Sequence, residues 1–470
     1  MAPVTRIGII GGGPGGYEAA LVAAQLGAEV TVVDTDGLGG SAVLTDCVPS
    51  KTLIATAESV IDTDESGGLG VRLGERRVLP AGYVSVDLAA VNARVLELAR
   101  AQSDDIATRL EKEGVRVLRG RGRLDGPGRI VADLAGGGEE SVEADAVLVS
   151  TGAHPRELPD AVPDGERILT WEQVYALGEL PEHLVVVGSG VTGAEFASAY
   201  TALGAQVTLV SSRDRVLPGE DADAATVLED VFRRRGMTVL SRSRAGQVRR
   251  TSSGVEVSLE DGRTVEGSHC LMAVGSIPNT AGIGLEEAGV RLGPGGFIEV
   301  DRVSRTSVSS VYAAGDCTGV LMLASVAAMQ GRTAMWHALG DAVTPLNLHA
   351  VSSNVFTDPE IATVGWSEKE IETTTNDVVA VKLPLATNAR AKMQGMTEGF
   401  VKLFARTGSG IVVGGVVVAP KASELVYPIA IAVDVRLTVD QLAHSFTVYP
   451  SISGSVAEAA RQLHTKVRPD

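Results

Sequence analysis

Two glycine-rich turns, each set between a short apolar run and an alanine-rich segment, constrain the fold of this chain most strongly. The first turn reads Gly11-Gly12-Gly13-Pro14-Gly15-Gly16; it follows the apolar run 6–10 and precedes a helical pattern that reaches about residue 26. An apolar run bounded by glycines is typical of a strand buried on both faces of a parallel sheet. A second strand is predicted over 29–33 and ends at Asp34. The segment therefore predicts a β-α-β unit.

The same pattern begins again at Leu184. Residues 184–187 predict a strand, and they are followed by the turn Gly188-Ser189-Gly190-Val191-Thr192-Gly193, a helix over 194–203 and a strand over 206–210. Two such units in one chain are an internal repeat. The fold class predicted is α/β, with two Rossmann-like dinucleotide-binding domains.

Beyond about residue 350 the pattern changes. Strands are predicted over 400–404 and 411–418, and one apolar helix is predicted over 423–433. A further helix is predicted earlier in the chain, over 86–113. The C-terminal part therefore predicts a third domain, which does not bind a nucleotide.

A lone Gly-x-Gly-x-x-Gly is weak evidence, but a position between a strand and a helix is the confirming context. In the first turn Gly11 permits the tight bend, Gly13 lets the backbone approach a pyrophosphate, and Gly16 lets the helix pack on the strand. The equivalent residues of the second turn are Gly188, Gly190 and Gly193. A diphosphate then lies at the N-terminus of each helix, where N–H groups point outward and the helix dipole favours anions.

The two units differ where the second strand ends. Asp34 is placed to accept a hydrogen bond from a ribose 2′-hydroxyl. In the second unit, Val210 is followed by Ser211-Ser212-Arg213-Asp214-Arg215. A carboxylate repels a 2′-phosphate and arginine attracts it, so Ser212 and Arg213 predict a site that accepts NADPH and also NADH. The alternative is a solvated basic loop that takes no part in binding.

Composition excludes several classes of function. The length of 470 residues suggests two to four domains. The net charge of -17 argues against nucleic-acid or anionic-membrane binding, since both require a basic face. Three cysteines fit a reducing compartment, and the scattered histidines predict no metal site. No signal peptide or apolar run long enough for a membrane helix is visible, so we expect a cytoplasmic protein.

Residues 39–51, read with the two turns, resemble the redox motif of the flavoprotein disulfide reductases, the class I pyridine nucleotide-disulfide oxidoreductases that include dihydrolipoamide dehydrogenase. The resemblance covers nearly the whole chain. Further motifs that carry it are Ser150-Thr151-Gly152, Ala273-Val274-Gly275, Val311 to Asp316, Val355 to Glu360, Gly399 to Lys402 and Ala422 to Leu425.

The resemblance implies FAD, a pyridine nucleotide and a homodimer. It also implies an FAD-binding domain over 1–157 and 279–349, an NAD(P)-binding domain over 158–278 and an α+β dimerisation domain over 350–470. The cofactor-binding residues that it implies, besides those already named, are Ser41, Lys51, Gly122, Thr151, Gly152, Glu195, Val274, Gly275, Asp316 and Ala324.

Hydride transfer is implied by two residues that match the family. Lys51 and Glu195 occupy positions that form an ion pair beside the flavin and nicotinamide rings of family members. A cation there stabilises the negative charge of a reduced flavin, and the carboxylate orients the cation. The alternatives are a solvated lysine and a first-turn glutamate favoured by the helix dipole.

The dithiol apparatus of the family is missing. Ala42 stands in place of the first cysteine of the redox pair, so the family's disulfide with Cys47 cannot form. Tyr449 replaces the catalytic histidine, and Gly454 replaces the glutamate that orients it. Ser325 replaces a further histidine common in the family. Cys47 is either a passive residue or one with a flavin-contact or sulfenic-acid role.

These losses predict an NAD(P)H-dependent flavoenzyme that passes electrons to a quinone or another soluble acceptor, similar to the mycobacterial-type quinone reductases of the family that lack the disulfide. By the resemblance, Tyr449 would lie at the flavin of the partner subunit. Two alternatives stay open. One is a soluble pyridine nucleotide transhydrogenase, and the other is a flavin-bound sensor or interaction protein without turnover.

Overall fold

The computed structural model describes residues 4–72, 84–374 and 377–467. The chain forms two compact units. The first contains residues 1–52, 92–156 and 275–346, and the second contains residues 53–91, 157–274 and 347–470. The predicted boundaries of the three domains stay predictions.

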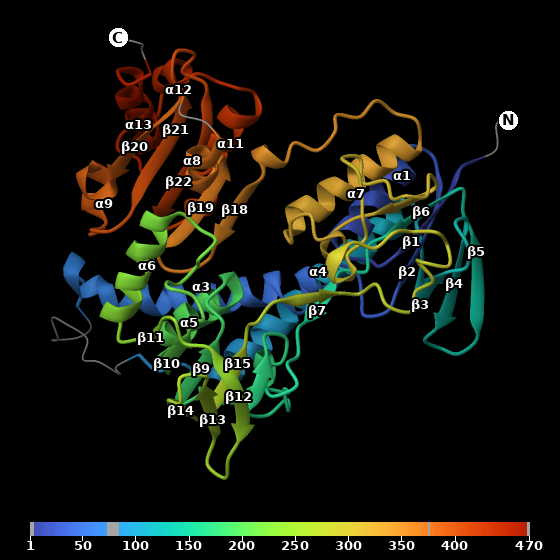
Figure 1. Ribbon diagram of the computed structural model, residues 1–470, viewed down its shortest axis with the longest axis horizontal. Coiled ribbons are helices and arrows are strands. Elements are labelled where there is room, and N and C mark those ends of the chain that lie inside the picture. Colours follow the sequence, from blue (N-terminus) through green and yellow to red (C-terminus); the bar gives the residue numbers. More distant parts are fainter. Residues whose placement is uncertain (1–3, 73–83, 375–376, 468–470) are drawn as a thin grey trace. The chain divides into compact units, whose positions relative to one another are not determined.

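The first unit is built on a seven-stranded sheet with the order β17-β6-β1-β2-β3-β4-β5 (Figure 1). The strands from β17 to β3 pair in parallel, and β4 and β5 continue the sheet antiparallel. The strands are β1 (Arg6–Ile10), β2 (Glu29–Asp34), β3 (Arg116–Leu124), β4 (Arg129–Leu134), β5 (Glu139–Glu143), β6 (Ala146–Val149) and β17 (Val311–Ala313). A separate two-stranded ribbon pairs β7 (Ala153–Pro155) with β16 (Ser276–Pro278).

Two helices of the first unit, α1 (Pro14–Gln25) and α7 (Ala324–Ala338), lie against each other (Figure 1). A Cβ atom added at Gly331 of α7 would lie 2.0 Å from the backbone oxygen of Gly15 of α1. The two helices can therefore lie this close together only with glycine at position 331. The other helical elements of this unit are α2 (Gly40–Leu44), η3 (Pro294–Gly296) and η4 (Asp316–Thr318). Helices α3 (Cys47–Glu65) and α4 (Leu88–Lys112) run across the division between the units.

The second unit contains a parallel sheet with the order β11-β10-β9-β15-β8, followed by the antiparallel sheet β12-β13-β14. Their strands are β8 (Ile168–Thr170), β9 (His183–Val187), β10 (Gln206–Val210), β11 (Thr238–Leu240), β12 (Ala245–Arg250), β13 (Val255–Leu259), β14 (Thr264–Gly267) and β15 (His269–Met272). Its helical elements before residue 347 are η1 (Ser66–Leu69), η2 (Val174–Ala176), α5 (Val191–Leu203) and α6 (Ala222–Arg234).

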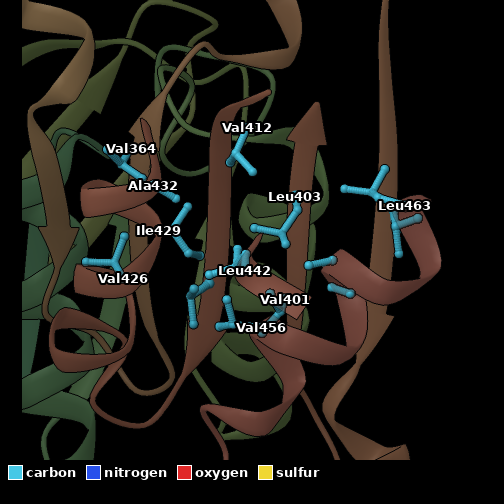
Figure 2. Close-up of a cluster of buried hydrophobic side chains, with 14 of the residues drawn as sticks. Val364, Val401, Leu403, Val412, Val426, Ile429, Ala432, Leu442, Val456 and Leu463 are labelled. Carbon is cyan, nitrogen blue, oxygen red and sulfur yellow. The ribbon is translucent and has the colours of Figure 1, made fainter. Parts of the chain in front are cut away.

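The C-terminal part of the second unit forms an antiparallel sheet with the order β18-β19-β22-β21-β20. The strands are β18 (Ser352–Val355), β19 (Glu360–Gly365), β20 (Val378–Pro384), β21 (Phe400–Arg406) and β22 (Val412–Ala419). The helical elements are η5 (Leu348–Ala350), α8 (Glu368–Thr374), η6 (Leu385–Thr387), α9 (Ala389–Met393), α10 (Ala422–Leu425), α11 (Tyr427–Asp434), α12 (Val439–His444) and α13 (Gly454–His464). Figure 2 shows Leu403, Val412 and Ile429 among the apolar side chains between this sheet and its helices.

The predicted strands and nucleotide-unit helices lie within a few residues of the observed ones, but the predicted helix 423–433 is two helices. Helix α10 ends at Leu425, and α11 begins at Tyr427 with Pro428 in its first turn. Proline has no N–H to donate to a preceding turn and its ring crowds the residue before it. The chain therefore restarts a helix at this point.

One buried cation lies among the elements of the second unit. Lys402 on β21 is almost fully buried, and its Nζ lies 2.8 Å from Asp221 Oδ2, 2.7 Å from Asp223 Oδ2 and 3.4 Å from Glu368 Oε2. Asp221 is also the N-cap of α6 and accepts from the backbone N–H groups of Asp223 and Ala224. A buried lysine needs such partners because its desolvation is costly.

Among the residues that the structure describes, none of the helices combines the length and the apolar character needed to cross a membrane. In the same described ranges, no group of three or more His, Cys, Asp or Glu side chains is arranged to hold a metal ion.

Candidate active site

The first glycine-rich turn closes tightly between β1 and α1. A Cβ atom added at Gly16 would lie 1.9 Å from the backbone oxygen of Gly11, so no other residue fits there without movement. Gly13 is the N-cap of α1, and a Cβ atom at this position would meet nothing within 4 Å. The open space in front of Gly13 therefore lies at the N-terminus of a helix, where a diphosphate binds favourably.

Asp34 ends β2 beside this turn. Its Oδ2 accepts from the backbone N–H of Gly12 at 2.7 Å, and its Oδ1 accepts from the backbone N–H of Gly37 at 2.6 Å. Burial raises the pKa of the Asp34 carboxyl, and the two N–H groups oppose this effect. Each carboxylate oxygen keeps a further lone pair, so the side chain can also accept from a ribose hydroxyl.

A cavity of about 370 Å³ adjoins Asp34 within the first unit. It brings together four of the residues that the sequence predicted for cofactor binding, Gly11, Asp34, Gly122 and Thr151. The Thr151 hydroxyl donates to the backbone oxygen of Asn279 at 2.7 Å, which fixes the cavity wall. Gly152 follows with a φ of 68°, a conformation that favours glycine.

Asp316 is the first residue of η4, and a two-residue loop separates it from the end of β17. Burial, and then the neighbouring negative charge of Asp46, raise the pKa of the Asp316 carboxyl to about 6. The loop before it is fixed by the backbone N–H of Gly315, which donates to Gln330 Oε1 of α7 at 2.8 Å. Ala324, another predicted cofactor residue, is the first residue of that helix.

The second glycine-rich turn repeats the geometry of the first. A Cβ atom added at Gly193 would lie 1.9 Å from the backbone oxygen of Gly188, whereas one added at Gly190 would meet nothing within 4 Å. Gly190 is the N-cap of α5. The second unit therefore holds a second potential diphosphate site between β9 and α5.

Ser211 is not among the residues predicted for this site, but it directly follows β10. The sheet registers pair Ile10 with Val33 in the first unit and Val187 with Val210 in the second. Ser211 thus takes the place of Asp34. It is fully buried, and its Oγ lies 2.6 Å from Ser189 Oγ. Comparing the two strand ends residue by residue would have found it.

The other residues predicted to bind the pyridine nucleotide follow the end of β10 or the end of β15. Ser212 and Arg213 are exposed, and the backbone N–H of Arg213 donates to Ser211 Oγ at 3.1 Å. Val274 packs at the margin of the apolar core of the second unit. Gly275 has a φ of 97° and is the first residue of the segment 275–346, where the chain re-enters the first unit.

The redox motif folds into two helices. Ser41 and Ala42 lie in α2, Cys47 is the first residue of α3, and Lys51 lies one turn further along that helix. The described ranges contain all three cysteines of the chain and no disulfide. Cys270 and Cys317 are fully buried, and burial raises the pKa of the Cys317 thiol to about 11.

Glu195 lies in the first turns of α5 and is 3% exposed. Its Oε1 accepts from the backbone N–H of Phe356 at 2.9 Å. Lys51 belongs to the first unit and Glu195 to the second, and their pairing stays a prediction.

Tyr449 is one of three large apolar residues that stand out from the segment after α12. Phe446, Val448 and Tyr449 are 106%, 79% and 85% exposed. Tyr449 lines a cavity of about 310 Å³, together with Asn388 and Gly454 among others. A Cβ atom at Gly454 would make only ordinary contacts. A small side chain would therefore fit at position 454 without moving the backbone.

Comparisons with known proteins agree with this architecture. Residues 5–331 match the family model described as pyridine nucleotide-disulphide oxidoreductase, and residues 351–460 match the dimerisation domain of the same family. The chain belongs to this family. It is therefore an oxidoreductase whose cofactors are FAD and NAD(P)H.

Two curated relatives cover almost the whole chain. An NAD(P)H dehydrogenase (quinone) from Mycobacterium tuberculosis is 56% identical, over 98% of this chain and 94% of the relative. A dihydrolipoyl dehydrogenase from Bacillus subtilis is 33% identical, over 96% of this chain and 97% of the relative. The chain is thus similar to members of the family with different named activities.

Solved structures confirm the fold. The crystal structure of LpdA from Mycobacterium tuberculosis superimposes with a TM-score of 0.92 at 56% identity, over 98% of this chain and 100% of that one. The flavoprotein disulfide reductase RclA from Escherichia coli superimposes with a TM-score of 0.85 at 22% identity, over 97% of this chain and 99% of that one.

The residues of the first unit fit FAD. The open position at Gly13, the fixed carboxylate of Asp34 and the adjoining cavity supply the donors, the acceptor and the space that an adenosine diphosphate moiety needs. The second unit offers the same turn but a neutral strand end at Ser211. This difference suits a nucleotide whose ribose carries either a hydroxyl or a phosphate.

Proposed function

We propose that this protein is an FAD-dependent NAD(P)H:quinone oxidoreductase without disulfide reductase activity. The observation that carries the proposal is the redox motif itself. Ala42 takes the place of one sulfur, and both Cys270 and Cys317 are buried in apolar cores as thiols. The relative at 56% identity named NAD(P)H dehydrogenase (quinone) supports the same assignment.

The reaction oxidises NAD(P)H by two electrons and reduces a quinone to a hydroquinone, with one proton taken from solution. The bound FAD supplies the redox chemistry, because it can accept a hydride equivalent and give up electrons to an acceptor. The turns at Gly13 and Gly190 bind the diphosphates of the two cofactors. Lys51 stabilises negative charge at the reacting ring, and Glu195 orients Lys51.

The part of the site where the electron acceptor would bind lacks a group suited to exchanging protons with a thiol. Tyr449 stands where the family has a histidine, so the imidazole that exchanges protons with a thiol in those enzymes is missing here. An aromatic residue at position 449, together with Ala42, favours contact with a planar apolar ring, whereas Val43 is buried in the core of the first unit. In the proposed homodimer, Tyr449 would contribute this contact to the flavin of the partner subunit.

The neutral strand end favours a second candidate, a pyridine nucleotide transhydrogenase. The buried hydroxyl pair of Ser189 and Ser211 discriminates little between a ribose and its 2′-phosphate. Such a site accepts NAD(H) and NADP(H) in turn, as a transhydrogenase requires. The redox motif supports this candidate less, because the transhydrogenases that it resembles keep the first cysteine, and this chain keeps the second.

An anaerobic stopped-flow experiment separates the candidates. The enzyme is reduced with one equivalent of NADPH and then mixed with a naphthoquinone, with an oxidised NAD analogue or with lipoamide. We expect rapid flavin reoxidation by the quinone and none by lipoamide. Rapid reoxidation by the NAD analogue alone would instead support the transhydrogenase. Absence of flavin reduction by either NADPH or NADH would favour a protein without turnover.

A further inference from the structure

The carboxylate of Glu195 is held by a backbone donor from the C-terminal part of the second unit. Its Oε1 accepts from the N–H of Phe356 at 2.9 Å, immediately after β18. A backbone N–H cannot rotate away as a side-chain donor can. The direction of the Glu195 carboxylate therefore depends on where residues 356–358 lie.

Residues 356–358 are attached to α5 at a second point. The backbone N–H of Asp358 donates to Ser198 Oγ at 3.4 Å, and Ser198 lies three residues after Glu195 on the same helix. Thr357 between them is buried, and its hydroxyl donates to the backbone oxygen of Pro359 at 2.8 Å. The segment thus follows one face of α5 and ends at Asp358.

Arg235 fixes the far end of this segment. It is the C-cap residue of α6. Its Nη2 lies 2.5 Å from Asp358 Oδ2, and its Nη1 donates to the backbone oxygen of Asp358 at 3.1 Å. The two side chains are 28% and 25% exposed. Two simultaneous contacts with one residue, partly shielded from water, define its position better than a single surface ion pair does.

We propose that Arg235 is a positioning residue for hydride transfer. Its guanidinium fixes Asp358, and residues 356–358 in turn present the N–H of Phe356 that orients the carboxylate of Glu195. The inference rests on the proposed role of Glu195 in orienting the cation beside the reacting ring. It adds the C-cap residue of α6, which lies outside both glycine-rich turns.

The neighbouring Arg234 provides a matched control. Its Nη1 lies 2.6 Å from Glu398 Oε1, and these side chains are 57% and 39% exposed. Arg234→Met removes the same charge from the same helix end and leaves residues 356–358 untouched. A more exposed ion pair of this kind contributes about 0–1 kcal/mol to stability.

Loss of Arg235 affects the rate of the reaction more than the binding of the nucleotide. Arg235→Met lets residues 356–358 shift, and a displacement of about 1 Å in a catalytic arrangement can cost up to about 100-fold in rate. We expect an about tenfold fall in the limiting rate of flavin reduction. The Kd for NADPH changes less than about twofold, because the diphosphate binds at the turn 188–193.

The test measures flavin reduction by NADPH in the FAD-loaded enzyme under anaerobic stopped-flow conditions. The variants are R235M, R235K, R234M, E195Q and the double variant E195Q/R235M. We expect R234M to stay within about twofold of wild type, R235K to recover part of the rate, and R235M to have no further effect in the E195Q background.

Two results would overturn the inference and leave the proposed role of Glu195 intact. The first is a limiting rate of flavin reduction in R235M equal to that in R234M. The second is a fall in that rate, on adding R235M, as large in the E195Q enzyme as in the wild type. If NADPH reduces the flavin of E195Q at the wild-type rate, the proposed role of Glu195 fails, and the inference fails with it. Should R235M not yield folded, FAD-loaded protein, Asp358→Asn replaces it, because it keeps the backbone contact with Arg235 and removes the ion pair. The limiting rate of D358N must then fall below that of R234M.

Discussion

Single residues at the ends of strands distinguish the two nucleotide-binding units. Asp34 is a partly buried carboxylate held by two backbone N–H groups, whereas Ser211 in the equivalent place is a buried hydroxyl bonded to Ser189. Both side chains end a parallel strand beside a glycine-rich turn. We therefore expect the chemistry of this residue to influence which ribose substituent each unit tolerates.

Ser211→Asp tests this comparison. A carboxylate at this position would lie close to a 2′-phosphate, and two like charges about 4 Å apart near a protein surface repel by several kcal/mol. We expect kcat/KM for NADPH to fall at least about tenfold relative to that for NADH. The measurement is steady-state kinetics with both nucleotides and one quinone. An unchanged ratio would show that the strand end does not determine the preference.

Asp316 makes stability depend on pH in the FAD-free protein. Burial and the charge of Asp46 raise its pKa to about 6, above the ordinary value of 3.8. The stabilisation of the protonated form is therefore complete below about pH 4 and is lost as the pH rises through about 6. Asn does not titrate, so Asp316→Asn should be more stable than wild type at pH 7, by about 1–3 kcal/mol, and should lose that advantage at pH 4.

Chemical unfolding of the two apoproteins between pH 4 and pH 7.5 measures this difference. A constant difference across that range would contradict the assignment of the titration to Asp316. The same substitution should weaken FAD binding, because it removes the acceptor that the family resemblance assigns to the ribityl chain.

At the scale of elements, the sequence predicted both β-α-β units because local signals agree there. The glycine spacing, the apolar strands 6–10 and 184–187 and the alanine-rich helices all indicate the same structure. The break between α10 and α11 was missed although Pro428 marks it, because the surrounding residues are apolar enough for one helix. The contacts of Glu195 with Phe356 and of Arg235 with Asp358 join residues far apart in sequence, and no local pattern predicts them.

Lys402 links α6, α8 and β21, and its removal should be costly. Lys402→Met would leave the carboxylate of Asp221, which is 4% exposed, without its cation. Breaking a buried pair in this way costs about 3–5 kcal/mol. The matched control is Lys382→Met, because Lys382 pairs with Asp223 at an exposed site, and its loss should cost less than about 1 kcal/mol. Urea unfolding of both variants would contradict this account if their midpoints shifted equally.

At the scale of the whole molecule, the matched dimerisation domain leads us to propose a homodimer. One face of α11 exposes Tyr427 and Ile431, and Val435, the residue that follows the helix, is exposed four residues further on. Large apolar side chains on one helix face are typical of an interface. Phe446 and Tyr449 are exposed as well, and we propose that a second copy covers these side chains.

Ile431→Asp tests that surface. A charge in the centre of an apolar interface is costly to bury, so we expect the variant to sediment as a monomer at concentrations at which the wild type is a dimer. Quinone reduction should fall with it, because each flavin would lose the Tyr449 of the other subunit. An unchanged dimer would show that the interface lies elsewhere.

The central claim is that electrons leave this enzyme without passing through a disulfide. A disulfide takes up two electrons, so an enzyme with FAD and a redox-active disulfide accepts four electrons per subunit, and one with FAD alone accepts two. Anaerobic titration with dithionite, followed by flavin absorbance, counts them directly. The account predicts complete flavin reduction at two electrons per subunit, and a requirement for four would contradict it.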